Sequence, residues 1–440
     1  MRRLGAMALA ALLLAGCDNR GEMPGTASGK IAIEFWHSQK RQNKDALEAV
    51  VARFNAQSPT YEIKLSNLGS YTTLFQKLRT TALGKGDMPQ LAIAYESMVA
   101  ELMQADCVAA LDDYINHPDY GLSKEDQDDI FPSFLNSNRY PEFDGKLLSF
   151  PFTKSLLMLY YNAEILRAAG HEQPPATWKE FLQQCRDVKA KTDKLPYAYA
   201  RDPSSFDSMI MSRGGQLAPN RGATSGLGSP QAVETLALLK TLVDEKLAIV
   251  IPFESDDDRL YFSQGKCAFI LRSSTTRSYM RKDMVDEQGR DRFAWSIACP
   301  PVGEGQPKLT VLYGGNIVMF KSTPERQRGA WEFMKFFISR DITAEWSVKT
   351  GYLPVRRSAA ETKTLQDFFA EHPRNRAPFD TIPYGVREPS VAGWQKIRDE
   401  IAQALTRVVK QGADPARVAA DLAKAADAEL ARRRKQRKTG

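Results

Sequence analysis

The sequence predicts an α/β fold built as two lobes rather than as one large sheet. Residues 30–94 alternate short apolar strands with amphipathic helices across short connections, a pattern typical of parallel sheets with right-handed crossovers. A similar alternation begins again near residue 150. The chain has 440 residues, of which 43% are hydrophobic, and this length is enough for two or three domains with sizeable cores.

The first alternating unit contains three strands and two helices, assigned from the spacing of their apolar residues. We expect strands at Lys30–Trp36, Tyr61–Leu65 and Leu91–Ala94, and helices at Asn43–Asn55 and Tyr71–Leu83. In open parallel sheets, ligands bind beyond the carboxyl ends of the strands. Residues that follow these strands, such as His37, Tyr71 and Glu96, are therefore early candidates for a binding site.

The rest of the chain shows the same kinds of segment. We expect strands at Ser149–Thr153, Leu157–Tyr161 and Val311–Phe320, and helices at Asn162–Ala169, Lys179–Lys189, Gln231–Glu245, Arg328–Ser339, Pro389–Lys410 and Pro415–Arg432. Thr177 is a suitable N-cap for the helix that follows it. Inside the segment Val311–Phe320, Gly314 and Gly315 would let another part of the backbone come close.

The net charge of +7 is concentrated at the two ends of the chain. Arg2, Arg3 and the basic tail 431–440 carry eight positive charges, so residues 18–430 are close to neutral. A basic nucleic-acid surface is therefore not indicated. The four histidines form no HxxxH pair, so we expect no histidine-rich metal site.

Residues 1–17 have the properties of an export signal. Arg2 and Arg3 precede an uncharged apolar run from Leu4 to Gly16, which as a helix would span about 20 Å, too short for a hydrocarbon core of ~30 Å. The segment Leu14–Cys17 resembles a bacterial lipobox, which implies cleavage before Cys17 and acylation of its thiol; a plain cleaved leader is the alternative. Asp18 resembles an inner-membrane retention signal for a Gram-negative host. Residues 18–29 are polar and rich in glycine, as in a flexible tether.

Four cysteines lie outside the leader, and none of their spacings matches a zinc knuckle or a CxxC redox pair. In an oxidising compartment Cys267 and Cys299 could form a disulfide. Buried free thiols are the alternative, and the sequence does not decide between them.

Several short strings together resemble a known family. They are EFWHS (34–38), FNA (54–56), YYN (160–162), PPATW (174–178), GKCAF (265–269), YGG (313–315), KTGYLP (349–354) and Ile397-Arg398. Across nearly the whole mature chain they resemble the extracellular solute-binding proteins of bacterial ABC importers, in the branch that includes maltose-binding protein. FWHS, KTGYLP and Ile397-Arg398 resemble most closely the sn-glycerol-3-phosphate and glycerophosphodiester binders.

The resemblance implies a type II periplasmic-binding-protein fold, with a mostly parallel, helix-flanked sheet in each lobe and a ligand cleft between them. Lobe one would hold 30–153 and 300–340, and lobe two 154–299 and 341–430, with crossings near 152–155, 297–302 and 339–343. It also implies a monomeric periplasmic protein, held to the inner membrane by its lipid anchor. That protein would pass a small phosphate ester to a permease and its ATPase, without catalysis, cofactor or metal.

The ligand residues that the resemblance implies are Tyr71, Glu96, Ser155, Ser273, Gly315, Tyr352 and Arg398, with Trp36 as an apolar wall. Their chemistry suits a glycerol phosphate. Arg398 can form a bidentate pair with a phosphate, the hydroxyl groups and the Gly315 amide are neutral donors, and Glu96 can accept hydrogen bonds from glycerol hydroxyls.

Each of these residues also has a structural explanation. Arg398 could form a surface salt bridge beside Asp399, Glu96 could face the positive end of its helix dipole, and the tyrosines, the serines, the glycines and Trp36 could serve packing alone.

The segment Tyr199–Met211 lacks the tryptophan of phosphodiester binders. Arg201 and Asp202 in that segment could alter what the far end of the ligand meets, and Lys154 could assist anion binding or face solvent.

Three other functions compete with phosphate-ester binding. A sugar or oligosaccharide binder of the same family is the nearest alternative. A glycerophosphodiester hydrolase would need a metal or a histidine base, for which the scattered histidines supply no motif. An interaction protein would act through the tail 431–440, which is otherwise a solvated helix end or a contact for anionic membrane phosphates.

Overall fold

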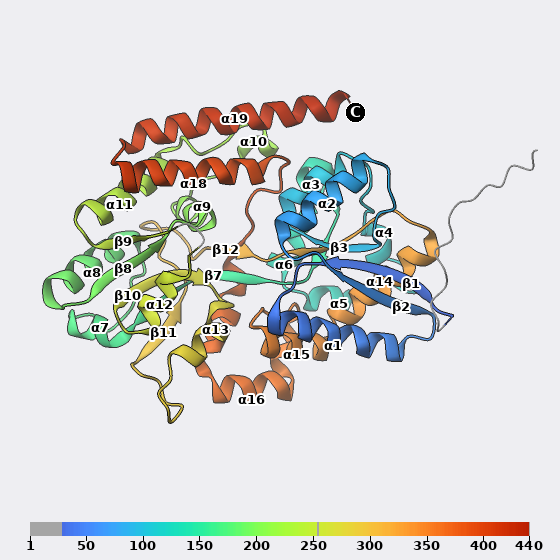
Figure 1. Cartoon of the computed structure of the whole chain (residues 1–440), viewed down its shortest axis with the longest axis horizontal. Helices are drawn as coiled ribbons and strands as arrows, with labels where there is room; N and C mark the ends of the chain where they lie inside the picture. Colours follow the sequence, from blue (N-terminus) through green and yellow to red (C-terminus); the bar gives the residue numbers. More distant parts are fainter. Residues whose placement is uncertain (1–28, 253–254, 440) are drawn as a thin grey trace, which may run out of the picture.

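The computed structural model describes residues 29–252 and 255–439. The leader, Cys17 and almost all of the tether lie outside this part of the chain. Two α/β lobes lie side by side, the first coloured mainly blue to cyan and the second mainly green to yellow (Figure 1). The predicted two-lobe α/β architecture is therefore confirmed.

The first lobe is built on a five-stranded sheet. Its order is β2 (Tyr61–Asn67), β1 (Ile31–His37), β3 (Leu91–Ala94), β13 (Asn316–Met319) and β6 (Phe150–Pro151). Strands β2, β1 and β3 are parallel, with Ile31 opposite Tyr61, whereas β13 is antiparallel to both of its neighbours. The carboxyl ends of β1, β2 and β3 therefore share one edge, as the sequence predicts.

The second lobe is built on a seven-stranded sheet. The strands are β14 (Gly385–Val386), β12 (Thr310–Tyr313), β7 (Ser155–Asn162), β10 (Cys267–Ser273), β8 (Leu195–Ala200) and β9 (Ala248–Ile251), with β11 (Trp295–Ala298) also paired to β7. The pairings make β7 the one strand that runs against the others. In each sheet of the described chain, a single strand is thus reversed. A two-stranded ribbon, β4 (Arg139–Tyr140) with β5 (Lys146–Leu147), completes the strands.

Helices cover both sheets, and each lobe has its own hydrophobic core. Those that accompany the first sheet are α1 (Arg41–Gln57), α2 (Tyr71–Leu83), α3 (Glu96–Met103), α4 (Asp112–Ile115), α5 (Lys124–Asp129), α6 (Pro132–Ser137), α14 (Pro324–Phe337) and α15 (Arg340–Thr350). Those of the second are α7 (Ala163–Ala168), α8 (Trp178–Lys191), α9 (Pro203–Met211), α10 (Pro219–Gly222), α11 (Pro230–Asp244), α12 (Asp257–Ser263), α13 (Thr276–Asp283), α18 (Trp394–Gln411) and α19 (Pro415–Thr439). Two further helices, α16 (Lys363–Glu371) and α17 (Arg376–Thr381), lie in the connection to α18.

The predicted strand Val311–Phe320 is wrong in one respect. It is two strands, β12 in the second sheet and β13 in the first. Gly314 has φ +99°, a conformation that favours glycine, so the chain turns there and passes between the lobes. Residues 300–313, expected in lobe one, therefore belong with the second sheet.

The third crossing also lies later than expected. Helix α15 was assigned to lobe two, but Ile342 and Trp346 are buried in the core of the first lobe. Their apolar side chains keep α15 with lobe one because both would otherwise be exposed to water. The chain therefore crosses after this helix rather than at residues 339–343.

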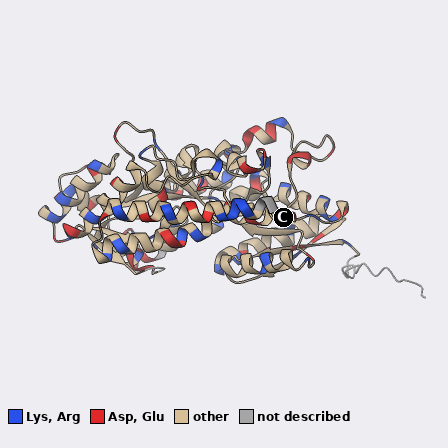
Figure 2. Cartoon of the chain, turned by 90° about the horizontal axis from the view of Figure 1, so that it is seen from above, with Lys and Arg blue, Asp and Glu red and all other residues tan. Residues whose placement is uncertain are grey.

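Helix α19 is longer than predicted and contains most of the basic tail. It runs unbroken from Pro415 to Thr439, and its C-terminal end extends over α2 and α3 of the first lobe (Figure 1). The basic residues gather at this end, seen as the continuous blue stretch beside the C-terminus (Figure 2). No helix among residues 29–252 and 255–439 has both the length and the apolarity needed to cross a membrane.

Candidate functional site

The candidate site surrounds the point where two crossing segments touch. Thr153 donates from its amide and its hydroxyl to the Gly315 carbonyl, at 3.1 and 3.0 Å. A Cβ on Gly314 would lie 1.4 Å from the Thr153 carbonyl oxygen, so a larger residue cannot occupy this position. The glycine pair therefore allows the close backbone approach that the sequence indicates.

Tyr71 places an unused hydroxyl at this crossing. It is the first residue of α2, whose N-cap Ser70 accepts from the Thr73 amide at 3.0 Å. Its ring stacks on Tyr95 at 4.5 Å, and a Cβ on Gly315 would lie 3.1 Å from its Oη. The buried hydroxyl makes no hydrogen bond of normal geometry in the described chain. Burial raises its pKa, an effect that the neighbouring Thr153, Gly315 and Gln39 partly offset. Tyr71 is therefore a neutral donor available to a ligand.

Ser155 and Ser273 meet at the edge of the second sheet. Ser155 begins β7 and Ser273 ends β10, and Ser273 Oγ donates to Ser155 Oγ at 3.1 Å. Ser273 Oγ also lies 2.9 Å from Thr275 Oγ1. These hydroxyls form a short chain in which Ser273 donates to Ser155.

Tyr352 approaches the crossing from the other side. It follows Gly351, the left-handed C-cap of α15, and its ring stacks parallel to Trp346 with 6.1 Å between centroids. Burial raises the pKa of its hydroxyl well above the usual value, and the nearby Tyr71 adds to this effect. Like Tyr71, it is a neutral donor at neutral pH.

Glu96 already has a charged partner within the protein. Its Oε1 lies 3.3 Å from Lys154 Nζ, and the Lys154 side chain has no exposed surface. Lys154 also contacts Ser137 Oγ at 3.3 Å, and burial lowers its pKa. This carboxylate therefore neutralises a buried ammonium group, which neither faces solvent nor is free to bind an anion.

Arg398 lies on α18 at the lobe interface and already has partners. Its Nη1 donates to Ser204 Oγ at 2.6 Å and to Glu388, and its Nη2 lies 3.8 Å from Asp202 Oδ1. Burial opposes its charge, but Glu388 and Asp202 outweigh this effect and raise its pKa. The side chain is 22% exposed, so a ligand can still reach it.

Further acidic groups surround this arginine. Tyr313 Oη donates to Asp202 at 2.7 Å. Asp207 is fully buried, and neither of its carboxyl oxygens has a hydrogen-bond partner in the described chain. Burial, reinforced by Glu388, raises the pKa of Asp207 well above its usual value and so favours the protonated form of this carboxyl. Glu388 and Asp202 thus both face one guanidinium, and this pole is less cationic than the sequence predicts.

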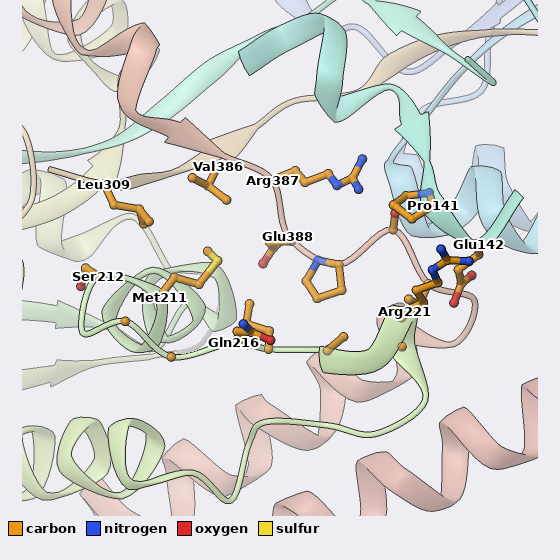
Figure 3. A pocket seen from close by; sticks show the side chains of 18 of the residues that line it. Pro141, Glu142, Met211, Ser212, Gln216, Arg221, Leu309, Val386, Arg387 and Glu388 are labelled. Carbon is orange, nitrogen blue, oxygen red and sulfur yellow. The ribbon is translucent and has the colours of Figure 1, made fainter. Parts of the chain in front are cut away.

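A cavity of about 480 Å³ opens beside Glu388. In Figure 3, Glu388 lies between Val386 above and Met211 below, while Arg221 and Glu142 lie side by side at one end. Glu142 comes from the first lobe and Met211 from the second. The cavity therefore lies between the lobes, next to the Glu388–Arg398 pair.

Of the predicted ligand residues, Trp36 has its ring beside a side chain of α2. Lys77 Nζ of α2 is 4.4 Å from the centre of the Trp36 ring, so a neighbouring side chain covers one face of it. The structure gathers the others around the two crossings. They are Tyr71, Glu96, Ser155, Ser273, Gly315, Tyr352 and Arg398.

The sequence analysis missed Tyr95, Tyr313, Asp207 and Glu388 as members of this group. Glu388 lies in the irregular segment before α18, where no periodicity marks it. The position of Tyr95 after β3 was a usable signal.

No cluster of residues suited to hold a metal ion occurs in the described ranges. Of the two possibilities left open for Cys267 and Cys299, the structure shows free thiols, as it does for all four cysteines described.

Comparison with known proteins agrees with this architecture. A family model described as bacterial extracellular solute-binding protein matches residues 49–374. The sn-glycerol-3-phosphate-binding periplasmic protein UgpB of Escherichia coli K12 is 26% identical over 370 residues, covering 79% of this chain and 80% of that protein.

Solved structures of two similar proteins share the fold. MalE, a sugar-binding protein of Xanthomonas citri, is 22% identical with a TM-score of 0.80, covering 92% of this chain and 98% of its own. UgpB of Mycobacterium tuberculosis in complex with glycerophosphocholine is 23% identical with a TM-score of 0.77, covering 92% and 99%.

Proposed function

Because this chain belongs to the family of bacterial extracellular solute-binding proteins, we propose that the solute it binds is a glycerol phosphate ester. Members of this family are the solute-binding components of ABC importers and are not enzymes, as the sequence predicts. The proposed ligand is held between the lobes, and the protein delivers it to the permease.

The position of Arg398 carries this proposal. Its guanidinium lies at the lobe interface and is partly exposed, with Ser204 as a neutral partner and Glu388 and Asp202 as acidic ones. At the neighbouring crossing, Tyr71 has a buried hydroxyl that makes no hydrogen bond of normal geometry in the described chain. A phosphate ester accepts hydrogen bonds at every non-bridging oxygen, and one arginine can engage two of them. An ester oxygen at the Tyr71 hydroxyl would supply the partner that this group lacks.

The carboxylates around Arg398 favour a diester over a monoester. Glu388 and Asp202 oppose a second anion, and a dianionic monoester meets more repulsion than a diester with one charge. A diester with a cationic headgroup, such as glycerophosphocholine, gains attraction to the same carboxylates. The similarity to UgpB of M. tuberculosis, solved with glycerophosphocholine, is consistent with this choice.

A sugar or oligosaccharide is the second candidate. The stacked pair Tyr71–Tyr95 and the carboxylates of Asp202 and Glu388 are groups that pack against and accept from hydroxylated rings. MalE of X. citri shares the fold. A sugar carries no charge, so in this case Arg398 would not pair with an anionic group of the ligand.

Thermal unfolding with a panel of solutes separates the two candidates. A ligand present at 100 times its dissociation constant stabilises the folded protein by about 2.7 kcal/mol. We expect glycerophosphocholine to raise the unfolding temperature more than sn-glycerol-3-phosphate does, and maltotriose to leave it unchanged. A rise with maltotriose and none with either ester would replace the proposal by the sugar candidate.

The membrane attachment is a separate part of the proposal. The mature chain begins at Cys17, which carries lipid on its thiol and holds the protein at the periplasmic face of the inner membrane, as a monomer. The lipobox LAGC supports this assignment. Cys17→Ser should abolish incorporation of labelled palmitate and release the protein from the membrane fraction. Unchanged labelling would contradict the anchor.

A further inference from the structure

A second, larger cavity lies between the start of α1 and the segments around α13 and α15. Its volume is about 850 Å³, and it shares no lining residue with the cavity beside Glu388. Gln42 lines it from the first lobe, Arg277 and Ser278 from α13, and Lys349 from the last turn of α15. Two loops, 285–295 and 371–375, close the remainder.

Arg277 is a buried cation in the wall of this cavity without a counterion. It is only 5% exposed, its Nη1 donates to the Ser274 carbonyl, and its Nε has no hydrogen-bond partner in the described chain. No carboxylate of the described residues forms an ion pair with it. Arg356 is buried to a similar extent, at 7%, but pairs with both Asp126 and Asp129.

The missing counterion has an energetic meaning. A buried charge is tolerated when it is paired and hydrogen-bonded, and is costly otherwise. Burial lowers the pKa of Arg277 to about 10, still far above neutral pH, so the group remains charged. An arginine in this state is ready to receive an anion that enters the cavity.

The other charges around the cavity leave an excess of positive charge. Arg374 pairs with Asp291, and Arg290 pairs with Asp286. Glu371 and His372 lie next to each other at 3.1 Å. Lys349 is exposed and has no ion-pair partner in the described chain. Two cations, Arg277 and Lys349, are therefore available to a ligand.

We propose that this cavity is a second binding site, which takes a small oxyanion (a phosphate or carboxylate group) between Arg277 and Lys349. The guanidinium offers its fork to two oxygens, and the ammonium contacts the anion from the solvent side. The site goes beyond the proposed function and does not depend on it, because neither cation belongs to the group around Arg398.

Titration with inorganic phosphate tests the site. We expect phosphate to raise the unfolding temperature of the wild type, and Arg277→Gln and Lys349→Gln each to weaken phosphate binding about ten- to hundredfold. The surface variant Lys424→Gln serves as the control and should retain binding. If phosphate has no effect on the wild type, or if its effect is lost in Arg398→Gln but kept in Arg277→Gln, the proposal is wrong.

Stability without phosphate separates a ligand site from a structural role. Arg277→Gln removes an unpaired buried charge, so the unfolding temperature should stay the same or rise. Arg356→Gln, the matched variant of a paired buried arginine, should lower it. If Arg277→Gln does not fold, Arg277 is structural and this part of the proposal fails; Lys349→Gln then decides whether the cavity binds phosphate.

A competition experiment identifies the source of the oxyanion. Calorimetry with glycerophosphocholine is repeated in saturating inorganic phosphate. If the sites are separate, the affinity for the diester is unchanged, and the site takes a free anion. If phosphate competes, the two ligands share a site, which overturns the assignment of a separate site. Absence of any diester binding refutes the proposed function alone and leaves the phosphate titration valid.

Discussion

Arg433 Nη1 in α19 lies 3.1 Å from Glu101 Oε2 in α3, so the last helix of the second lobe is bound directly to the first lobe. Both side chains are largely buried, at 15% and 6% exposure. Nearby, Gln395 Nε2 donates to Ser97 Oγ at 2.8 Å across the same boundary. The tail was expected to be a solvated helix end or a contact for anionic membrane phosphates, whereas one of its arginines forms part of the lobe contact.

We predict that Arg433→Ala weakens solute binding. The ion pair favours the arrangement in which the lobes touch. Its loss should cost about 1 kcal/mol, which corresponds to an about fivefold weaker affinity for the solute. Calorimetry with glycerophosphocholine measures this change. Arg432→Ala is the matched control, since Arg432 contacts Glu429 of its own helix. Equal affinities for the two variants and the wild type would show that the contact has no part in closure.

Glu388→Gln should shift the preference among esters. The substitution removes one of the two carboxylates that face Arg398, so repulsion of a dianionic phosphate falls. We expect affinity for sn-glycerol-3-phosphate to rise about tenfold relative to that for glycerophosphocholine. The surface variant Glu304→Gln should leave this ratio unchanged. A fall in affinity for both esters would show that Glu388 positions Arg398 rather than opposing the ligand.

Glu96→Gln should destabilise the fold. It leaves the Lys154 ammonium, which has no exposed surface, without a counterion, and such losses cost about 3 kcal/mol or more. Adding Lys154→Met should restore much of this stability, because no buried charge remains. Denaturant unfolding of the three variants forms a double-mutant cycle. If the two single effects simply add, the pair is not coupled, and Glu96 is available to a ligand after all.

Acid should destabilise the protein through His37. This residue is 1% exposed, and burial lowers its pKa from 6.5 to about 4. Between these values, the unfolded chain takes up a proton that the folded chain does not, so falling pH favours unfolding. By pH 5 this effect lowers the free energy of unfolding by about 2 kcal/mol. His37→Gln should remove this part of the pH dependence, which denaturant unfolding between pH 7 and pH 5 measures. If the free energy of unfolding falls equally with pH in the variant and the wild type, His37 is not the group responsible.

Local patterns predicted most elements well. Tyr71–Leu83 and Leu91–Ala94 have the predicted bounds, and Thr177 caps its helix by accepting from the Glu180 amide at 3.1 Å. These features depend on nearby residues alone. The pair Gly314–Gly315 was noticed, yet the split of one strand between two sheets depends on contacts with Thr153, far away in the sequence.

The charge balance of the site could not be predicted in the same way. The sequence marked Arg398 as a cation, but its electrostatics depend on Glu388 and Asp202, which tertiary structure brings to it. Lys154 was expected to face the ligand or solvent, whereas the fold buries it against Glu96. Tertiary packing decides which polar groups pair with each other. Such pairings produce no periodic pattern in the sequence, so sequence analysis does not detect them.

Native mass spectrometry of the freshly purified protein is the most direct check on the nature of the solute. Our account predicts one retained solute per chain, with the mass of a glycerophosphodiester, and its loss in Arg398→Ala. A retained solute with the mass of a sugar or an oligosaccharide, kept equally by wild type and Arg398→Ala, would contradict it.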